Sequence, residues 1–179
     1  LAYLYRYTRE FEKALTASER AIELLPNDSR AYIAYRNSLF FNRRWDEIKG
    51  AMKKAYEIDP LDPGTANMYA RELSSSGEYE EAIEIFDGII RNYPEFGPAY
   101  GEKAWIYRDV PYGEIDKAFE IVYEIYQKNP DDLNLMIELV NISHDVKFMP
   151  FAEYLIAKMD ELYPNNGNAL RTKINHQFI

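Results

Sequence analysis

The chain has 179 residues, of which 47% are hydrophobic and 28% are charged, a balance typical of folded globular proteins. Its formal net charge of −9 argues against a nucleic-acid-binding protein, because such a protein needs a basic surface. The absence of cysteine excludes disulfide scaffolds, thiolate metal sites and cysteine nucleophiles.

No apolar run of the sequence approaches the roughly 20 residues that span a bilayer, so no membrane segment is expected. A chain without cysteine suits either the cytoplasm or the periplasm, and we expect the cytoplasm. Neither end of the sequence resembles a polar capping unit, so we expect a piece of a longer protein.

Five prolines divide the chain at intervals of 34, 34, 36 and 34 residues, and they are Pro26, Pro60, Pro94, Pro130 and Pro164. A fixed period in this range is typical of stacked structural repeats. Because proline cannot continue a helix, each one is expected one or two residues after a helix end. The spacing predicts one array over 1–179, with helix pairs at 1–28, 29–62, 63–96, 97–132 and 133–166 and a partial repeat at 167–179.

The predicted helices follow in chain order from this spacing. In repeat two, a helix capped by Ser29 is expected to run to about Asn42, and its partner to run from Trp45 to about Ile58. Similar pairs in the other repeats, with a lone helix in the partial repeat, bring the expected number of helices to eleven.

Further prolines and glycines mark helix starts and turns. Pro63 and Pro98 stand where a helix begins, the position that tolerates a missing N–H group. Gly77 and Gly113 fall in turns inside their repeats, where glycine readily adopts a left-handed backbone. Two extra residues in the DVPYGE turn of repeat four, residues 109–114, account for the 36-residue interval.

A small side chain recurs twelve residues before four of the five prolines, where small size lets two helices approach closely. The residues at this position are Ala14, Ile48, Ala82, Ala118 and Ala152. Repeat three adds a fuller motif, made of Ala66, Tyr69, Ala70 and Leu73 in its first helix and Tyr79, Ala82 and Phe86 in its second.

In these motifs the chain resembles the tetratricopeptide repeat family along essentially its whole length. The resemblance implies an all-α fold, a right-handed α-α superhelix of five helix-turn-helix repeats and a partial sixth. Arg36 departs from the pattern, because it replaces a small residue of the first helix of repeat two. We therefore expect that helix pair to be spread or locally repacked.

The resemblance also implies a binding surface, because the first helices of this family line a concave groove. Arginine, asparagine and aromatic side chains there suit an extended peptide that carries acidic groups. The predicted binding residues are Tyr3, Arg6, Tyr7, Arg30, Asn37, Phe41, Asn67, Arg71, Trp105, Arg108 and Asn141. Alternatively, the arginines pair with acids on the same face, among them Glu102 and Glu138.

The sequence contains no catalytic constellation. His144 and His176 are 32 residues apart and lack a metal-ligand pattern, and no glycine-rich phosphate loop is present. We therefore expect a non-catalytic protein-binding module without cofactor or metal, whose partner is a protein or peptide and not a nucleic acid.

Two alternatives remain open for the function. The sequence pattern of repeats one to three resembles that of repeat arrays attached to bacterial signalling proteins. This resemblance implies that the chain is the sensor or regulatory arm of a transcriptional regulator or nucleotide cyclase. The other is a scaffold that forms homo-oligomers through its ends, because both ends would expose the apolar face of an incomplete repeat.

Overall fold

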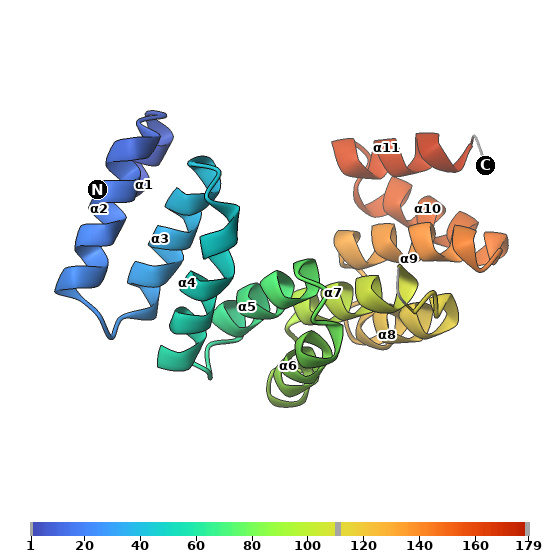
Figure 1. The fold of residues 1–179 in the computed structure, drawn as a ribbon. Helices are drawn as coiled ribbons and strands as arrows, with labels where there is room; N and C mark the ends of the chain where they lie inside the picture. Colours follow the sequence, from blue (N-terminus) through green and yellow to red (C-terminus); the bar gives the residue numbers. More distant parts are fainter. Residues whose placement is uncertain (1, 110–111, 178–179) are drawn as a thin grey trace. The chain divides into compact units, whose positions relative to one another are not determined.

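The computed structural model describes residues 2–109 and 112–177, and these residues form eleven α-helices (Figure 1). The chain divides into two compact units, residues 1–89 and 90–179, which are described separately. The first contains α1 (Ala2–Tyr7), α2 (Phe11–Leu24), α3 (Ser29–Phe41), α4 (Trp45–Ile58), α5 (Pro63–Ser75) and most of α6 (Tyr79–Asn92). The second contains α7 (Gly97–Arg108), α8 (Ile115–Lys128), α9 (Leu133–Asp145), α10 (Met149–Leu162) and α11 (Gly167–His176).

The helix bounds confirm the all-α fold and the eleven helices expected from the sequence. Each predicted repeat contains two successive helices, and the partial repeat contains α11. Val110 and Pro111, in the extended turn of repeat four, lie outside the described residues. That all the repeats form a single continuous array over 1–179 remains a prediction.

The spacing of the prolines reflects the ends of the second helices. The helices α2, α4, α6, α8 and α10 each end two residues before one of the five prolines. Proline lacks the N–H that the next helical hydrogen bond would require, and its ring would clash with the preceding turn. The prolines therefore limit all five second helices to 14 residues.

Four helices, α3, α5, α9 and α11, begin at side-chain caps, whereas α7 begins after Phe96 without one. Asp28, Asp62, Asp132 and Asn166 accept hydrogen bonds from backbone N–H groups at the starts of α3, α5, α9 and α11. The prediction that Ser29 caps its helix is wrong, because Asp28 is the cap and Ser29 is the first helical residue. The Asp28 carboxylate accepts from the Arg30 backbone N–H at 3.0 Å, and its charge also favours the positive end of the helix dipole.

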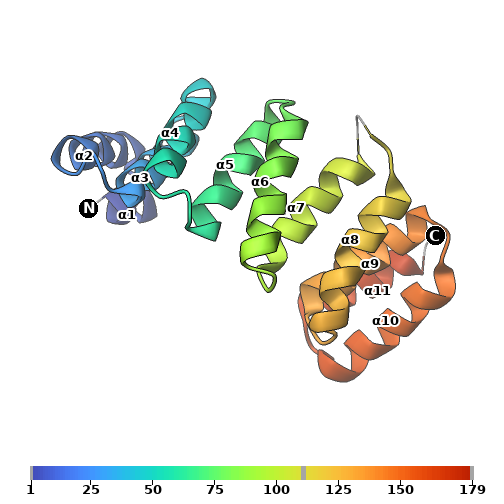
Figure 2. The same cartoon turned by 90° about the horizontal axis from the view of Figure 1, so that it is seen from below.

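Within each unit, helices pack on their neighbours in the chain and on their counterparts in the next pair. In the first unit, α1 to α5 contact in sequence, and α1 also contacts α3. In the second unit, α7 to α11 contact in sequence, with further contacts of α9 to both α7 and α11 (Figure 2). The first helices of successive pairs therefore form a continuous row in each unit.

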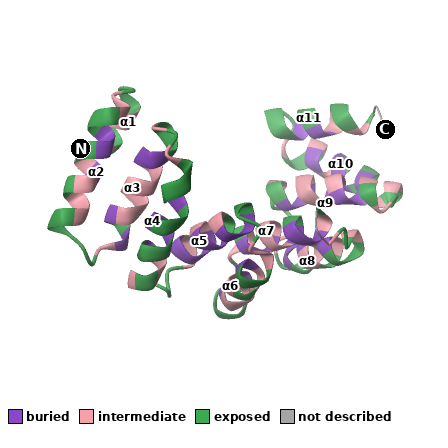
Figure 3. Cartoon of the chain, in the orientation of Figure 1, coloured by how far each residue is buried: buried purple, intermediate pink, exposed green. Residues whose placement is uncertain are grey.

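The small residues twelve positions before the prolines are buried where helices meet. Ala14 is 1% exposed and Ala82, Ala118 and Ala152 are fully buried, while the larger Ile48 is 4% exposed. Figure 3 shows buried residues on the helix faces that look toward other helices. This burial confirms that these positions serve packing.

Arg36 is directed toward the next repeat. Its Nη2 donates to Glu72 Oε1 of α5 at 2.6 Å, and its Nε donates to the same oxygen at 3.1 Å. The α3–α4 pair still closes around a core that includes Leu39, Ile48 and Ala51. Contrary to the expectation from the sequence, the arginine links α3 to α5, and the helix pair is not spread by it.

Each turn between the two helices of a repeat contains one residue with a positive φ. These residues are Arg9, Arg43, Gly77, Gly113 and Lys147, with φ values of 60°, 58°, 81°, 64° and 58°. They recur at the same intervals as the prolines, so the left-handed turn is part of the repeat. The sequence predicted it only at the two glycines, since arginine and lysine give no sign of this conformation.

A matched pair of glycine substitutions tests this turn. We expect Gly77→Ala to lower the free energy of unfolding by about 1 kcal/mol, because a Cβ at Gly77 meets no atom within 4 Å and only the left-handed backbone opposes it. Gly50→Ala, in the middle of α4 with equally open space, should raise it by about 0.5–1 kcal/mol. Urea unfolding measures both changes, and equal shifts of the two variants would contradict the role of the turn.

Candidate functional site

A hollow of about 280 Å³ lies between α1 and α3 in the first unit. Four of the predicted binding residues line it, namely Tyr3, Arg6, Arg30 and Asn37. Ile33 and Ala34 contribute apolar surface between the polar groups. The hollow forms because α1 packs on α3 as well as on α2, which brings the first helices of two repeats together.

The two arginines of this α1–α3 hollow differ in their partners. Arg30 forms a double hydrogen bond to Asp28, with Nε to Oδ1 at 2.9 Å and Nη2 to Oδ2 at 2.7 Å. The Arg6 guanidinium instead lies 4.9 Å from the ring centre of Tyr3 and 5.8 Å from that of Phe41. Among the described residues, no carboxylate forms an ion pair with Arg6, so its charge can attract an acidic group from outside.

The amide of Asn37 adds hydrogen-bonding capacity to the α1–α3 hollow. Its Oδ1 accepts from Arg36 Nη1 at 3.4 Å. In the described part of the chain, its amide nitrogen has no hydrogen-bond partner, so it can donate to a peptide carbonyl.

Aromatic side chains continue the surface beside the α1–α3 hollow. Phe41 is 41% exposed and stacks on Phe11, with ring centres 5.2 Å apart. Tyr7 is 80% exposed and lies 6.1 Å from the ring of Tyr3. These rings can cover apolar parts of a bound chain.

A second hollow, of about 420 Å³, lies on α7 and α9 in the second unit. Trp105, a predicted binding residue, lines it and is 44% exposed. Glu102, Asp132 and Glu138 also line it, together with apolar surface that includes Leu135. None of the described residues that line this α7–α9 hollow is basic.

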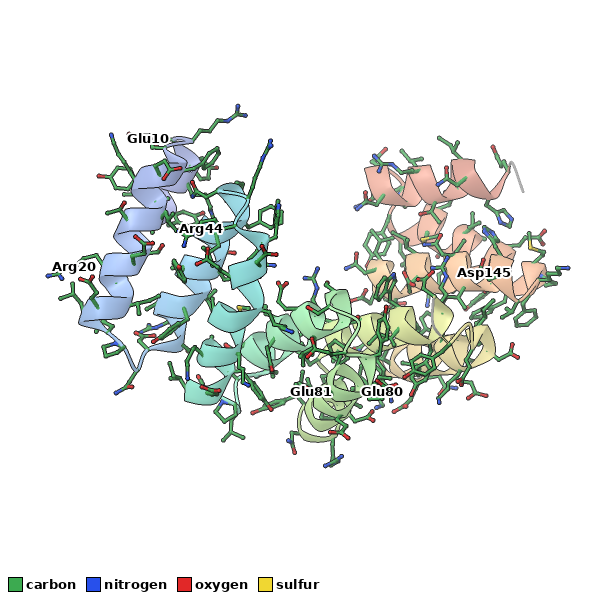
Figure 4. The ribbon with its side chains drawn as sticks, in the orientation of Figure 1. Glu10, Arg20, Arg44, Glu80, Glu81 and Asp145 are labelled. Carbon is green, nitrogen blue, oxygen red and sulfur yellow. The ribbon has the colours of Figure 1, made fainter. Side chains whose placement is uncertain are left out.

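Arg108, one turn after Trp105, is held by acids of α9. Its Nε donates to Asp145 Oδ2 at 2.8 Å, and its Nη1 lies 3.6 Å from Glu138 Oε1. Figure 4 labels Asp145 at the end of α9. Arg108 thus pairs with acids of its own face, including Glu138, as the alternative interpretation of the sequence anticipated.

The remaining predicted binding residues differ in accessibility. Asn67 is 8% exposed, and its Oδ1 is buried without a hydrogen-bond partner. Arg71 is exposed on α5, and Asn141 is half-buried on α9. The structure therefore gathers Tyr3, Arg6, Arg30 and Asn37 in one place and puts Trp105 in a separate hollow of the other unit.

His144 of α9 and His176 of α11 contact each other, a contact that the 32-residue separation did not predict. His144 Nε2 and His176 Nδ1 are 2.7 Å apart, and the rings stack with centres 5.0 Å apart. Burial lowers the pKa of His144 below its usual value, His176 lowers that pKa further, and Asp145 opposes this shift. The neutral imidazole is thus favoured in the folded chain.

Metal-binding clusters and membrane-spanning helices are both absent from the described residues. No group of three or more His, Cys, Asp or Glu side chains is placed to hold a metal ion there. None of the described helices combines the length and the apolar character needed to cross a membrane.

Comparisons with known proteins agree with the helix arrangement. No family model matches the chain. Tetratricopeptide repeat protein 7B of mouse and human is 31% identical over 83 residues, which is 46% of this chain and 10% of the relative. The crystal structure of TTC0263, a thermophilic TPR protein of Thermus thermophilus, superposes with a TM-score of 0.71 at 17% identity, covering 99% of this chain and 94% of that one.

The helix arrangement is that of tetratricopeptide repeat proteins. The structure of YrrB, a TPR protein with an unusual peptide-binding site, also matches, with a TM-score of 0.65 and 17% identity over 96% of this chain and 88% of that one. A protein of Gibberella zeae named methyltransferase is 27% identical over 99 residues, which is 54% of this chain and 14% of the relative. The chain therefore spans about a tenth of the length of the repeat protein 7B relatives and 14% of the methyltransferase.

Acidification should loosen α11 from α9. Because the folded-state pKa of His144 is lowered, the folded chain binds fewer protons than the unfolded chain just below the ordinary histidine pKa of about 6.5. The resulting stability is present above that value and is lost as the pH falls through the window below it. The protection of α11 amides against hydrogen exchange, relative to their intrinsic rates at each pH, should therefore fall between about pH 7 and pH 5.

A His144→Gln, His176→Gln variant provides the control, because carboxylates also titrate toward pH 5 while glutamine does not. The pH dependence of α11 exchange should be smaller in the variant than in the wild type. The same loss of protection in both proteins would contradict the role of the histidine pair.

Proposed function

We propose that this chain is a non-catalytic interaction module that binds an extended segment of a partner protein along its first helices. The observation that carries the proposal is the Arg6 guanidinium, which no carboxylate neutralises in the described chain. It lies in a hollow between the first helices of two successive repeats. In a chain with a net charge of −9, such a cation is suited to an acidic group of a partner.

The chemistry of the α1–α3 hollow supports an extended polypeptide as the ligand. Arg6 can bind a carboxylate through two parallel N–H groups, which gives direction as well as attraction. The Asn37 amide can donate to a main-chain carbonyl, and Tyr3 offers an apolar ring with a polar tip. A peptide carries acidic, main-chain and apolar groups within one short segment, as this arrangement requires.

The comparisons agree with this proposal at the level of the fold. Tetratricopeptide repeat modules generally mediate protein–protein interactions. YrrB, which shares the fold, is a TPR protein with an unusual peptide-binding site. The regulatory arm of a larger signalling protein and the self-associating scaffold stay predictions, and a peptide-binding surface is compatible with the first of them.

Peptide selection followed by matched variants tests the proposal. A library of random peptides is selected on the immobilised protein, and binding of the recovered peptides is measured by fluorescence anisotropy. We expect Asp or Glu in the recovered peptides, and we expect Arg6→Ala to weaken binding roughly threefold to fivefold, as for a partly exposed ion pair. Raising the salt concentration should also weaken binding, because the charges face solvent.

Arg20→Ala is the control, because Arg20 lies on α2, outside the α1–α3 hollow, and pairs with Glu23 of the same helix (Figure 4). It should leave the affinity unchanged. The proposal fails if no recovered peptide binds in solution, or if Arg6→Ala and Arg20→Ala bind equally well.

A further inference from the structure

The α7–α9 hollow combines an aromatic wall with carboxylates. Trp105 of α7 lines it with nearly half of its surface exposed, although tryptophan is usually well buried when it has only a packing role. Leu135 and Pro98 add apolar surface, and Gly97 and Gly101 keep the α7 side open, since they carry no side chain. The result is a concave site with room for a side chain from a partner.

The charge of the α7–α9 hollow is negative. Its lining includes Glu102, Asp132 and Glu138, and no basic side chain among its described lining residues. One Asp132 oxygen is engaged as the cap of α9, where it accepts from the backbone N–H groups of Asn134 and Leu135 at 2.8 and 3.1 Å. Arg108 Nη1 lies 3.6 Å from Glu138 Oε1, while Arg108 Nε donates to Asp145 Oδ2 at 2.8 Å.

Glu138 is the acid that would gain most from a bound cation. Its side chain is about one-third exposed, and Arg108 Nη1 remains 3.6 Å away, outside hydrogen-bond range. Burial raises the pKa of Glu138 above its usual value, Arg108 opposes the shift, and Asp109 and Asp145 reinforce it. A partly desolvated carboxylate that is incompletely compensated attracts a positive group strongly.

We propose that the α7–α9 hollow receives an arginine side chain of a partner protein, with its guanidinium against Trp105 and its N–H groups directed to Glu138. A planar guanidinium can stack on an indole face and bind a carboxylate at the same time, which a compact ammonium group does less well. The inference rests on the proposed function, since it names a residue type that a partner protein would present to the first helices of the second unit. Charge complementarity selects this occupant, because the described lining carries three acids and no basic side chain, so it attracts a cation and repels an acidic group.

The two tryptophans of the chain allow a direct test by nuclear magnetic resonance. Trp105 lines the hollow, whereas Trp45 begins α4 in the other unit and is 53% exposed. The probe is a blocked pentapeptide with one central arginine between glycines, added to the intact chain. We expect it to shift the indole N–H signal of Trp105 in a saturable manner and to leave that of Trp45 unchanged.

A second pentapeptide contains citrulline in place of arginine, which keeps the shape but removes the charge. It should not move the Trp105 signal over the same concentration range. Glu138→Gln should weaken binding of the arginine peptide roughly threefold to tenfold, the range of a partly desolvated ion pair. Glu153→Gln, an exposed position of α10 outside the hollow, should have no effect.

The inference is overturned if both peptides shift Trp105 equally, if Trp45 responds as strongly as Trp105, or if Glu138→Gln binds like Glu153→Gln. Its failure is distinguishable from failure of the proposed function. If selected peptides still bind in an Arg6-dependent manner while the arginine probe leaves Trp105 unmoved, the α7–α9 hollow alone has been assigned wrongly. If the arginine probe binds but no selected peptide depends on Arg6, the assignment of the α1–α3 hollow is the one that fails.

Discussion

The close crossing of helices at small buried side chains is the constraint on which the rest of the structure depends. A helix of 14 residues or fewer cannot cover its own apolar face, so each pair must be covered by the next. Ala82 and Ala118 are fully buried at the position that also carries Ala14 and Ala152. The second helices pack closely on the first helices that precede and follow them in the chain. The first helices of successive pairs are thereby brought together and present a shared face in each unit.

The way this shared face is built explains why polar side chains from different repeats lie together on it. Its side chains lie on adjacent helices from different repeats, so groups about 34 residues apart in the sequence become neighbours. Arg6 and Asn37 meet in this way in the first unit, and Trp105 and Glu138 line one hollow in the second. The two hollows differ in charge, so each is suited to a partner group of a different sign.

The fold was predictable because each proline ends its own helix, each small residue allows a close helix crossing, and both recur with one period. Pro60 fixes the end of α4 whatever surrounds it, and the Ala82 position tolerates no large side chain without strain. The left-handed turns at Arg43 and Lys147 were not predictable, since those residues usually avoid that conformation and only the repeated turn imposes it. The Asp28 cap was missed because two good capping residues stand side by side.

The candidate site was predictable in part, since the motif indicates which helix faces a ligand but not which charges are already paired. The bonds of Arg36 to Glu72 and of Arg108 to Asp145 join successive repeats, and their geometry cannot be derived from spacing. Both arginines are therefore engaged, whereas Arg6 forms no ion pair among the described residues and keeps its charge available.

The central claim, that first helices bind the partner, is tested most directly by amide chemical-shift mapping with a selected peptide. The account predicts that the largest shifts fall in α1 and α3 and that α2 and α4 change little. Shifts concentrated in α2 and α4 would contradict it.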